Sequence, residues 1–259
     1  MPELSDNLSR EFRTLVGFTS QEKLKHFYKA SDIEKPVNFE YIQELNSRLA
    51  EIVTKVNSVV HTSVQLSDIS TFLEKNLHLP FSLILQNNLL PLMNNQGRTP
   101  ENVYYNWMRG HLFSEYFKIA VSQIFQVPTN SILNVGEDDF TNVETFRRAA
   151  TADLEMELNN KVIRLEMQSG FTGINDIKQH KWSEAVQRSE ENVITLVAHF
   201  DLFNGAAAFI RLDNIAKEDL RWSTRQQLEG QTVYNIASEN FLWRITEHPP
   251  IFSALGIDL

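Results

Sequence analysis

The residues with the clearest capacity for chemistry are two acids, Asp153 and Glu166, which belong to one predicted β-hairpin. Residues 151–168 alternate apolar and polar side chains on both sides of Asn159 and Asn160. These two residues suit a two-residue turn, because asparagine tolerates positive φ. Counting outward from the turn places Asp153 directly opposite Glu166 on the polar face. The pattern therefore predicts two carboxylates that face each other.

Facing carboxylates need a source of compensating charge. Directly opposed side chains have Cβ atoms about 5 Å apart, and two unit charges at that distance repel by roughly 3 kcal/mol at an effective dielectric of about 20. The next pair on the same face, Glu155 opposite Arg164, contributes less than about 1 kcal/mol and does not offset this repulsion. Water on an open face, a proton on one carboxyl or a divalent cation would each relieve it. Among divalent cations, oxygen ligands favour Mg²⁺. The alternatives to a metal site are a polar face that only keeps the sheet soluble and a shifted strand register that separates the two acids.

Polar and basic residues after the hairpin extend this hypothesis. Gln168 lies two residues beyond Glu166 and shares its face. A helix is predicted next, with Lys178, Lys181 and Arg188 on one face. Such a face would hold a phosphate backbone, or it would simply be solvated.

Two further groups of residues have the chemistry of DNA contacts. Arg147 and Arg148 precede the acidic strand and would clamp phosphate, or would pair with nearby acids. Downstream, Arg221, Arg225 and Gln226 belong to a short stretch of arginines and amides of the kind that reads base edges in the major groove. The alternative for this stretch is an ordinary helix surface.

The elements that must position these residues are visible in the pattern. A helix is predicted over 39–60, and a longer one from Thr99, a suitable N-cap, to Phe125. Glu115 falls within the apolar stripe of the longer helix, where a boundary glutamate would reach out to water. Turns are expected around the prolines and asparagines of 80–97. Strands are predicted over 131–135, 152–158, 161–168, 193–198 and 206–212.

This order predicts an α/β protein with a mixed central sheet of about five strands flanked by helices. We expect a helical N-terminal region over 1–98, and an α/β core with a C-terminal DNA-contacting extension over 99–259. The 259 residues carry 24 Lys and Arg against 33 Asp and Glu, a net charge of −9, which disfavours nonspecific nucleic-acid binding. There is no cysteine, so disulfides are excluded, and no apolar run is long enough for a membrane span. A cytoplasmic protein with no membrane partner is expected.

The arrangement of Asp153, Glu166 and Gln168, with a helix carrying Glu115 before it and another helix after it, resembles the core of the PD-(D/E)XK nuclease superfamily, and within it type II restriction endonucleases. The resemblance implies a restriction-endonuclease-like fold over roughly 99–212. The chain departs from the motif at Ala152, where the name-giving proline would stand, and at Gln168, which replaces the usual lysine. A Glu-x-Gln ending is known among restriction endonucleases.

The resemblance also implies roles for individual residues. Asp153 and Glu166 would bind Mg²⁺, Gln168 would orient a water or the scissile phosphate, and Glu115 would be an accessory acid. Without a lysine at the third position, the general base is open: either the metal alone lowers the pKa of the water, which ranks first, or Lys178 approaches from the next helix.

The expected function is that of a type II restriction endonuclease that cleaves double-stranded DNA as a homodimer, since a palindromic target suits a two-fold protein. A repair or junction nuclease with the same core is the near alternative. A glycosidase that uses the two acids, and an interaction protein with an acidic face, are the alternatives from other classes.

Overall fold

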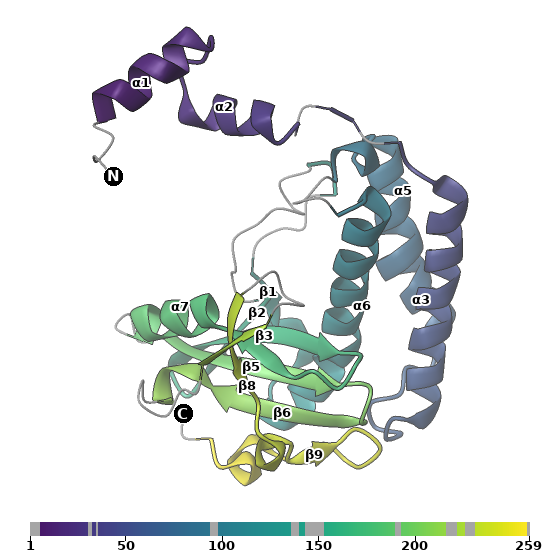
Figure 1. Ribbon diagram of the computed structural model, residues 1–259. Helices are drawn as coiled ribbons and strands as arrows, with labels where there is room; N and C mark the ends of the chain where they lie inside the picture. Colours follow the sequence, from purple (N-terminus) through teal and green to yellow (C-terminus); the bar gives the residue numbers. More distant parts are fainter. Residues whose placement is uncertain are drawn as a thin grey trace.

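The computed structural model describes the backbone over most of the chain, namely residues 6–30, 33–34, 36–93, 98–135, 140–142, 153–189, 193–215, 222–225 and 231–257. Helices come first along the chain and a mixed α/β part follows (Figure 1), which confirms the predicted α/β class. None of the described helices is both long and apolar enough to cross a membrane.

Helices make up the first part of the chain. Helices α1 and α2 project away from the body, whereas α3 and α6 lie side by side against it (Figure 1). The side chains of α3 and α6 that face each other are buried, and the Tyr104 hydroxyl donates to Asn46 Oδ1 across this contact at 2.5 Å. The helices are α1 (Asp6–Leu15), α2 (Gln21–Tyr28), α3 (Phe39–Val59), α4 (Ile69–Leu73), α5 (Leu79–Gln86), α6 (Pro100–Phe125) and α7 (Gln179–Ser189).

Two of these helices follow their predicted bounds closely. Helix α3 confirms the 39–60 prediction, and α6 begins after Thr99, whose side chain accepts a hydrogen bond from the Asn102 N–H. The turns expected near Pro80 are wrong, because Pro80 lies in a continuous helical stretch in which the π-turn Glu74–His78 leads directly into α5. Single-turn helices lie at Glu74–His78 (a π-turn), Leu90–Leu92, Thr129–Ser131, Leu212–Asn214, Ser238–Asn240 and Phe252–Leu255.

The strands form two sheets. The larger, six-stranded sheet has the order β1-β2-β3-β5-β6-β9, in which only β3 and β5 run parallel, and the smaller has the antiparallel order β4-β8-β7. Helix α7 lies between β4 and β5 in the chain. The strands are β1 (Leu133–Asn134), β2 (Leu154–Leu158), β3 (Lys161–Gly170), β4 (Asp176–Lys178), β5 (Val193–Asp201), β6 (Ala206–Arg211), β7 (Trp222–Arg225), β8 (Gln231–Asn235) and β9 (Trp243–Arg244).

The two faces of the large sheet have different coverings. One face packs against α6, and its core includes the stacked rings of Phe117 and Phe200, whose centroids lie 4.0 Å apart. The opposite face is covered by α7 and the small sheet through a second apolar cluster that includes Ile177, Ala185 and Val197. Because side chains alternate along a strand, the polar residues of β3 share this second face.

The hairpin of β2 and β3 has the register that the sequence predicts. Asn159 and Asn160 have φ of 52° and 60°, the left-handed conformations that a two-residue primed turn requires. The register pairs Leu154 with Leu165 and Glu155 with Arg164. The turn chemistry and the alternation together therefore determine which residues of β3 lie beside Asp153.

Candidate active site

Asp153 lies one residue before β2 and continues the pairing of the hairpin. Its N–H donates to the Leu165 carbonyl at 3.0 Å, and its own carbonyl accepts from the Val135 N–H at 3.0 Å. The carboxylate reaches across to β3, where Oδ2 accepts from the Met167 N–H at 2.7 Å. Asp153 is thus held against the strand that carries Glu166, although the paired residues of the hairpin begin at Leu154, and the Asp153 N–H bonds to the partner of that residue.

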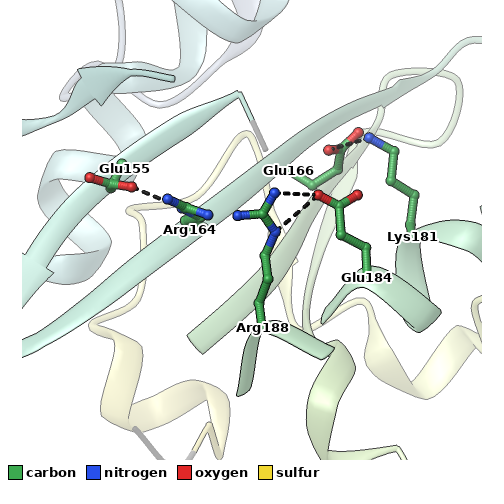
Figure 2. Close-up of polar contacts among 6 residues, drawn as sticks. All are labelled: Glu155, Arg164, Glu166, Lys181, Glu184 and Arg188. Carbon is green, nitrogen blue, oxygen red and sulfur yellow. Dashed lines mark hydrogen bonds and ion pairs between the residues drawn. The ribbon is translucent and has the colours of Figure 1, made fainter. Parts of the chain in front are cut away.

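Glu166 is buried on β3, with 9% of its surface exposed. Its Oε2 accepts from Lys181 Nζ of α7 at 2.6 Å (Figure 2). Burial and the negative charge of Asp153 raise the pKa of Glu166 to about 8, although Lys181 acts in the opposite direction. The compensating contacts of the two acids come from a lysine at Glu166 and a backbone N–H at Asp153. A lysine is not among the compensating groups predicted from the sequence, which were water, a proton and a divalent cation.

A cluster of charge pairs surrounds this ion pair. Figure 2 shows three pairs on the same side of the sheet, formed by Glu155 with Arg164, Glu166 with Lys181, and Glu184 with Arg188. A cavity of about 10 Å³ lies beneath them, bordered by Glu166, Lys181 and the buried Thr195. This volume is about that of one water, so it is too small for Mg²⁺ with its own water ligands.

The donor chemistry of the pair suits a hard cation, but two carboxylates are not a complete site. Among the described residues, no three histidines, aspartates or glutamates lie close enough together to hold a metal ion. Mg²⁺ is commonly held by one or two carboxylates and completed by water and phosphate oxygens. Asp153 and Glu166 fit that mode of binding.

No protein-family model, curated protein or solved structure matches the chain. The site is therefore interpreted from its own geometry.

Gln168 lies at one end of a partly buried chain of polar residues, in which His199 and Asp201 are the buried members. Its amide is 3.4 Å from His199 Nδ1 on the neighbouring strand β5, and His199 Nε2 is 2.7 Å from Asn175 Oδ1. Asn175 Nδ2 donates to Asp201 Oδ2 at 2.9 Å. His199, Asn175 and Asp201 are not among the site residues predicted from the sequence.

A signal for this chain of residues was available in the sequence. Strand β5 is buried at every position, so His199 and Asp201 are polar side chains two residues apart within an otherwise mostly apolar run. The parallel register places His199 beside Gln168 and Asp201 beside Gly170. The register itself was not accessible from the sequence pattern, because α7 separates the two strands in the chain.

The basic residues after the hairpin do not form the predicted helix face. Lys178 is the last residue of β4, where it pairs with Val233 of β8, so its predicted place on the helix is wrong. One continuous helix was predicted from the apolar spacing, but the residues with that spacing lie on both sides of the boundary between β4 and α7. Lys181 and Arg188 do lie on α7, and each pairs with a glutamate, Lys181 with Glu166 and Arg188 with Glu184.

Glu115 lies on the opposite side of the sheet, on α6. Its Oε1 accepts from Lys118 Nζ at 2.5 Å and from Asn134 Nδ2 of β1 at 3.2 Å. The side chain is 17% exposed, so it is partly buried and ion-paired, and does not extend freely into water. Its described contacts therefore tie α6 to the edge strand β1.

The remaining predicted DNA contacts are described only in part. Arg147, Arg148, Arg221 and Gln226 lie outside the described residues. Arg225 is the last residue of β7, where it pairs with Gln231, so the backbone of this stretch is a strand and the helix-surface alternative is wrong for 222–225.

Proposed function

We propose that the chain is a Mg²⁺-dependent endonuclease of the type II restriction class, which hydrolyses phosphodiester bonds of double-stranded DNA at specific sequences. The observation that carries the proposal is the position of the Asp153 carboxylate against β3, beside the buried Glu166 and its partner Lys181. Two acids and a lysine close together at the centre of β3 suit phosphodiester hydrolysis with a divalent cation.

The order of elements supports the same proposal. A long helix, α6, precedes three strands that pair in sequence, β1 to β3, and α7 then leads to the parallel strand β5. This is compatible with the fold implied by the resemblance to PD-(D/E)XK nucleases. Asp153 precedes the second of these strands, and Glu166 and Gln168 lie on the third.

In the proposed reaction, Asp153 and Glu166 would hold Mg²⁺, which would lower the pKa of a water and neutralise charge on the phosphoryl oxygens. Lys181, which donates to Glu166 at 2.6 Å, would donate a hydrogen bond to the scissile phosphate or to water. We therefore assign the lysine of the site to Lys181, in place of Lys178.

The alternative of an acidic interaction surface fits these contacts less well. Glu155, Glu166 and Glu184 are each paired with a cation of the same chain, so the face presents little uncompensated negative charge to a partner. We further propose that two copies act together on a palindromic target.

Incubation with phage DNA tests the proposal. Discrete fragments are expected with Mg²⁺ and none with EDTA. Asp153→Asn should reduce the cleavage rate by at least about 100-fold, the scale at which loss of one charge-stabilising group acts on a transition state. Glu155→Gln, which changes an acid on the same face that pairs only with Arg164, is the matched control and should cleave normally. Intact DNA with the wild-type protein, or equal cleavage by Asp153→Asn, would contradict the proposal.

A further inference from the structure

The partly buried chain of polar residues that ends at Gln168 begins at Asp201. This side chain is 2% exposed, and its carboxylate accepts from Asn204 Nδ2 at 2.6 Å and from the backbone N–H groups of Phe203 and Asn204 at 3.1 Å. Although burial acts to raise it, these hydrogen bonds and that of Asn175 keep the pKa of Asp201 below its ordinary value. An ionised carboxylate only accepts hydrogen bonds. The NH₂ group of Asn175 must therefore face Asp201, which turns Asn175 Oδ1 toward His199.

The position of Asn175 determines which nitrogen of His199 carries the proton. Nε2 lies 2.7 Å from Asn175 Oδ1, so Nε2 is the protonated donor. The ring is 3% exposed, and neither nitrogen contacts a carboxylate. Burial accordingly lowers the pKa of His199 to about 4, against the opposing charges of Asp201 and Asp176. A neutral ring has one N–H, so Nδ1 is an acceptor.

An acceptor at Nδ1 requires a donor from Gln168. The oxygen and nitrogen of a side-chain amide have the same shape, and their places are assigned by hydrogen-bonding partners. An Oε1 facing Nδ1 at 3.4 Å would set two acceptors against each other, so this end of the Gln168 amide is assigned as the NH₂ group. Gln168 lies two residues beyond Glu166 on the same face of β3, and the other end of its amide points away from His199 on the neighbouring strand.

We infer that Asp201, Asn175 and His199 are positioning residues that orient the Gln168 amide with its carbonyl oxygen toward the acid pair. The consequence for catalysis rests on the proposed nuclease function. A carbonyl oxygen accepts hydrogen bonds and repels phosphate oxygens, so Gln168 orients a water and does not donate to the scissile phosphate. The orientation of the amide therefore decides between the two roles left open for Gln168, orienting a water or contacting the scissile phosphate, in favour of the water.

Gly170 provides an independent sign that the contact between His199 and Asn175 is built into the fold. A Cβ at position 170 would lie 3.0 Å from both Asn175 Oδ1 and His199 Nε2, the two atoms that share the hydrogen bond. Almost any side chain there would displace one of them. Gly170 thus leaves room for the bond that sets the tautomer of His199.

Nitrogen-15 NMR of the imidazole groups tests the inference without DNA or cation. His199 is assigned from the signals that His199→Gln removes. At neutral pH the wild-type ring should be neutral, with its proton on Nε2, and Nδ1 should accept from the Gln168 NH₂, seen as a coupling across that hydrogen bond. A ring protonated on Nδ1, or on both nitrogens, would overturn the inference whether or not the protein cleaves DNA.

Steady-state cleavage kinetics test the consequence. Asn175→Leu should lower kcat by about 10-fold or more with KM unchanged, because it disturbs the orientation of a group at the reacting centre while leaving DNA binding intact. Asn235→Leu is the matched control, since this amide contacts Asp176 Oδ1 and the Asn175 carbonyl outside the partly buried chain of residues. A raised KM with unchanged kcat for Asn175→Leu would show that Gln168 binds phosphate and would overturn the inference. Absence of cleavage by the wild-type protein would contradict the proposed function alone, since NMR reads the amide orientation separately.

Discussion

The Lys181 ammonium lies 2.6 Å from the Glu166 carboxylate and joins α7 to the centre of β3. Both side chains are about seven-eighths buried, with 13% and 12% of their surfaces exposed. The lysine pairs with one of the two acids, and the Met167 N–H donates to the carboxylate of the other, Asp153.

Removal of Lys181 should destabilise the fold by an amount that depends on pH. In Lys181→Met, the Glu166 carboxyl has lost the lysine ammonium that pairs with it. Above about pH 8 this buried carboxyl is then either ionised without a partner or protonated at a cost in free energy. We expect the free energy of unfolding to fall by about 3 kcal/mol at alkaline pH, and by only about 1 kcal/mol near pH 6, where the protonated carboxyl loses one hydrogen bond. Urea unfolding at the two pH values measures the difference.

The matched control for that variant is Arg188→Met on the same helix. Arg188 pairs with Glu184 at 2.9 Å, but these side chains are 30% and 29% exposed. Its loss should therefore cost less than about 1 kcal/mol at either pH. Equal losses of unfolding free energy in Lys181→Met and Arg188→Met would mean that burial gives the Glu166–Lys181 pair no greater effect on stability than an exposed pair has.

The raised pKa of Glu166 predicts the pH dependence of wild-type stability on the alkaline side. The folded protein keeps this proton up to about pH 8, whereas the unfolded carboxyl releases it near 4.5. Between these values the folded state binds more protons, so the Glu166 contribution to stability falls as pH rises. Glu166→Gln should remove that slope. Unfolding free energies measured from pH 6.5 to 8, above the range in which His199 titrates, check this prediction. Equal slopes for the wild-type protein and Glu166→Gln would contradict it.

His199 predicts the opposite slope on the acid side. Burial lowers its pKa to about 4, against an ordinary value of 6.5, so in this window the unfolded chain binds more protons than the folded protein. The His199 contribution is complete above pH 6.5 and is lost as pH falls toward 4. His199→Gln should therefore be less sensitive to acid than the wild-type protein when unfolding is followed over that range. A steeper loss in the variant would show that the ring is charged in the folded state.

The Asn159–Asn160 turn should be sensitive to conformation and insensitive to side-chain chemistry. Asn160 has φ of 60°, where an ordinary residue costs about 1 kcal/mol and glycine costs none. Asn160→Ala should lower the free energy of unfolding by about 1 kcal/mol, and Asn160→Gly should leave it unchanged or raise it. Thermal unfolding of both variants checks this. If alanine were as stable as glycine, the turn would not have this conformation.

The local parts of the site follow from the sequence, whereas the contacts between distant elements do not. Alternation and turn chemistry predict the hairpin and hence the place of Asp153 beside Glu166. The contact of Lys181 depends on where β4 ends and α7 begins, and the apolar spacing around Ile177 obscured that boundary. The chain from His199 to Gln168 depends on the parallel register of β3 and β5, which is set by tertiary packing.

Calorimetric titration of the wild-type protein with Mg²⁺ tests the central claim most directly. Because binding requires the ionised form of Glu166, it should release protons at neutral pH, seen as a dependence of the heat on the buffer. Asp153→Asn should bind at least about 10-fold more weakly, and Glu155→Gln should bind as the wild-type protein does. Absence of Mg²⁺ binding by the wild-type protein, or an unchanged affinity in Asp153→Asn, would contradict the account.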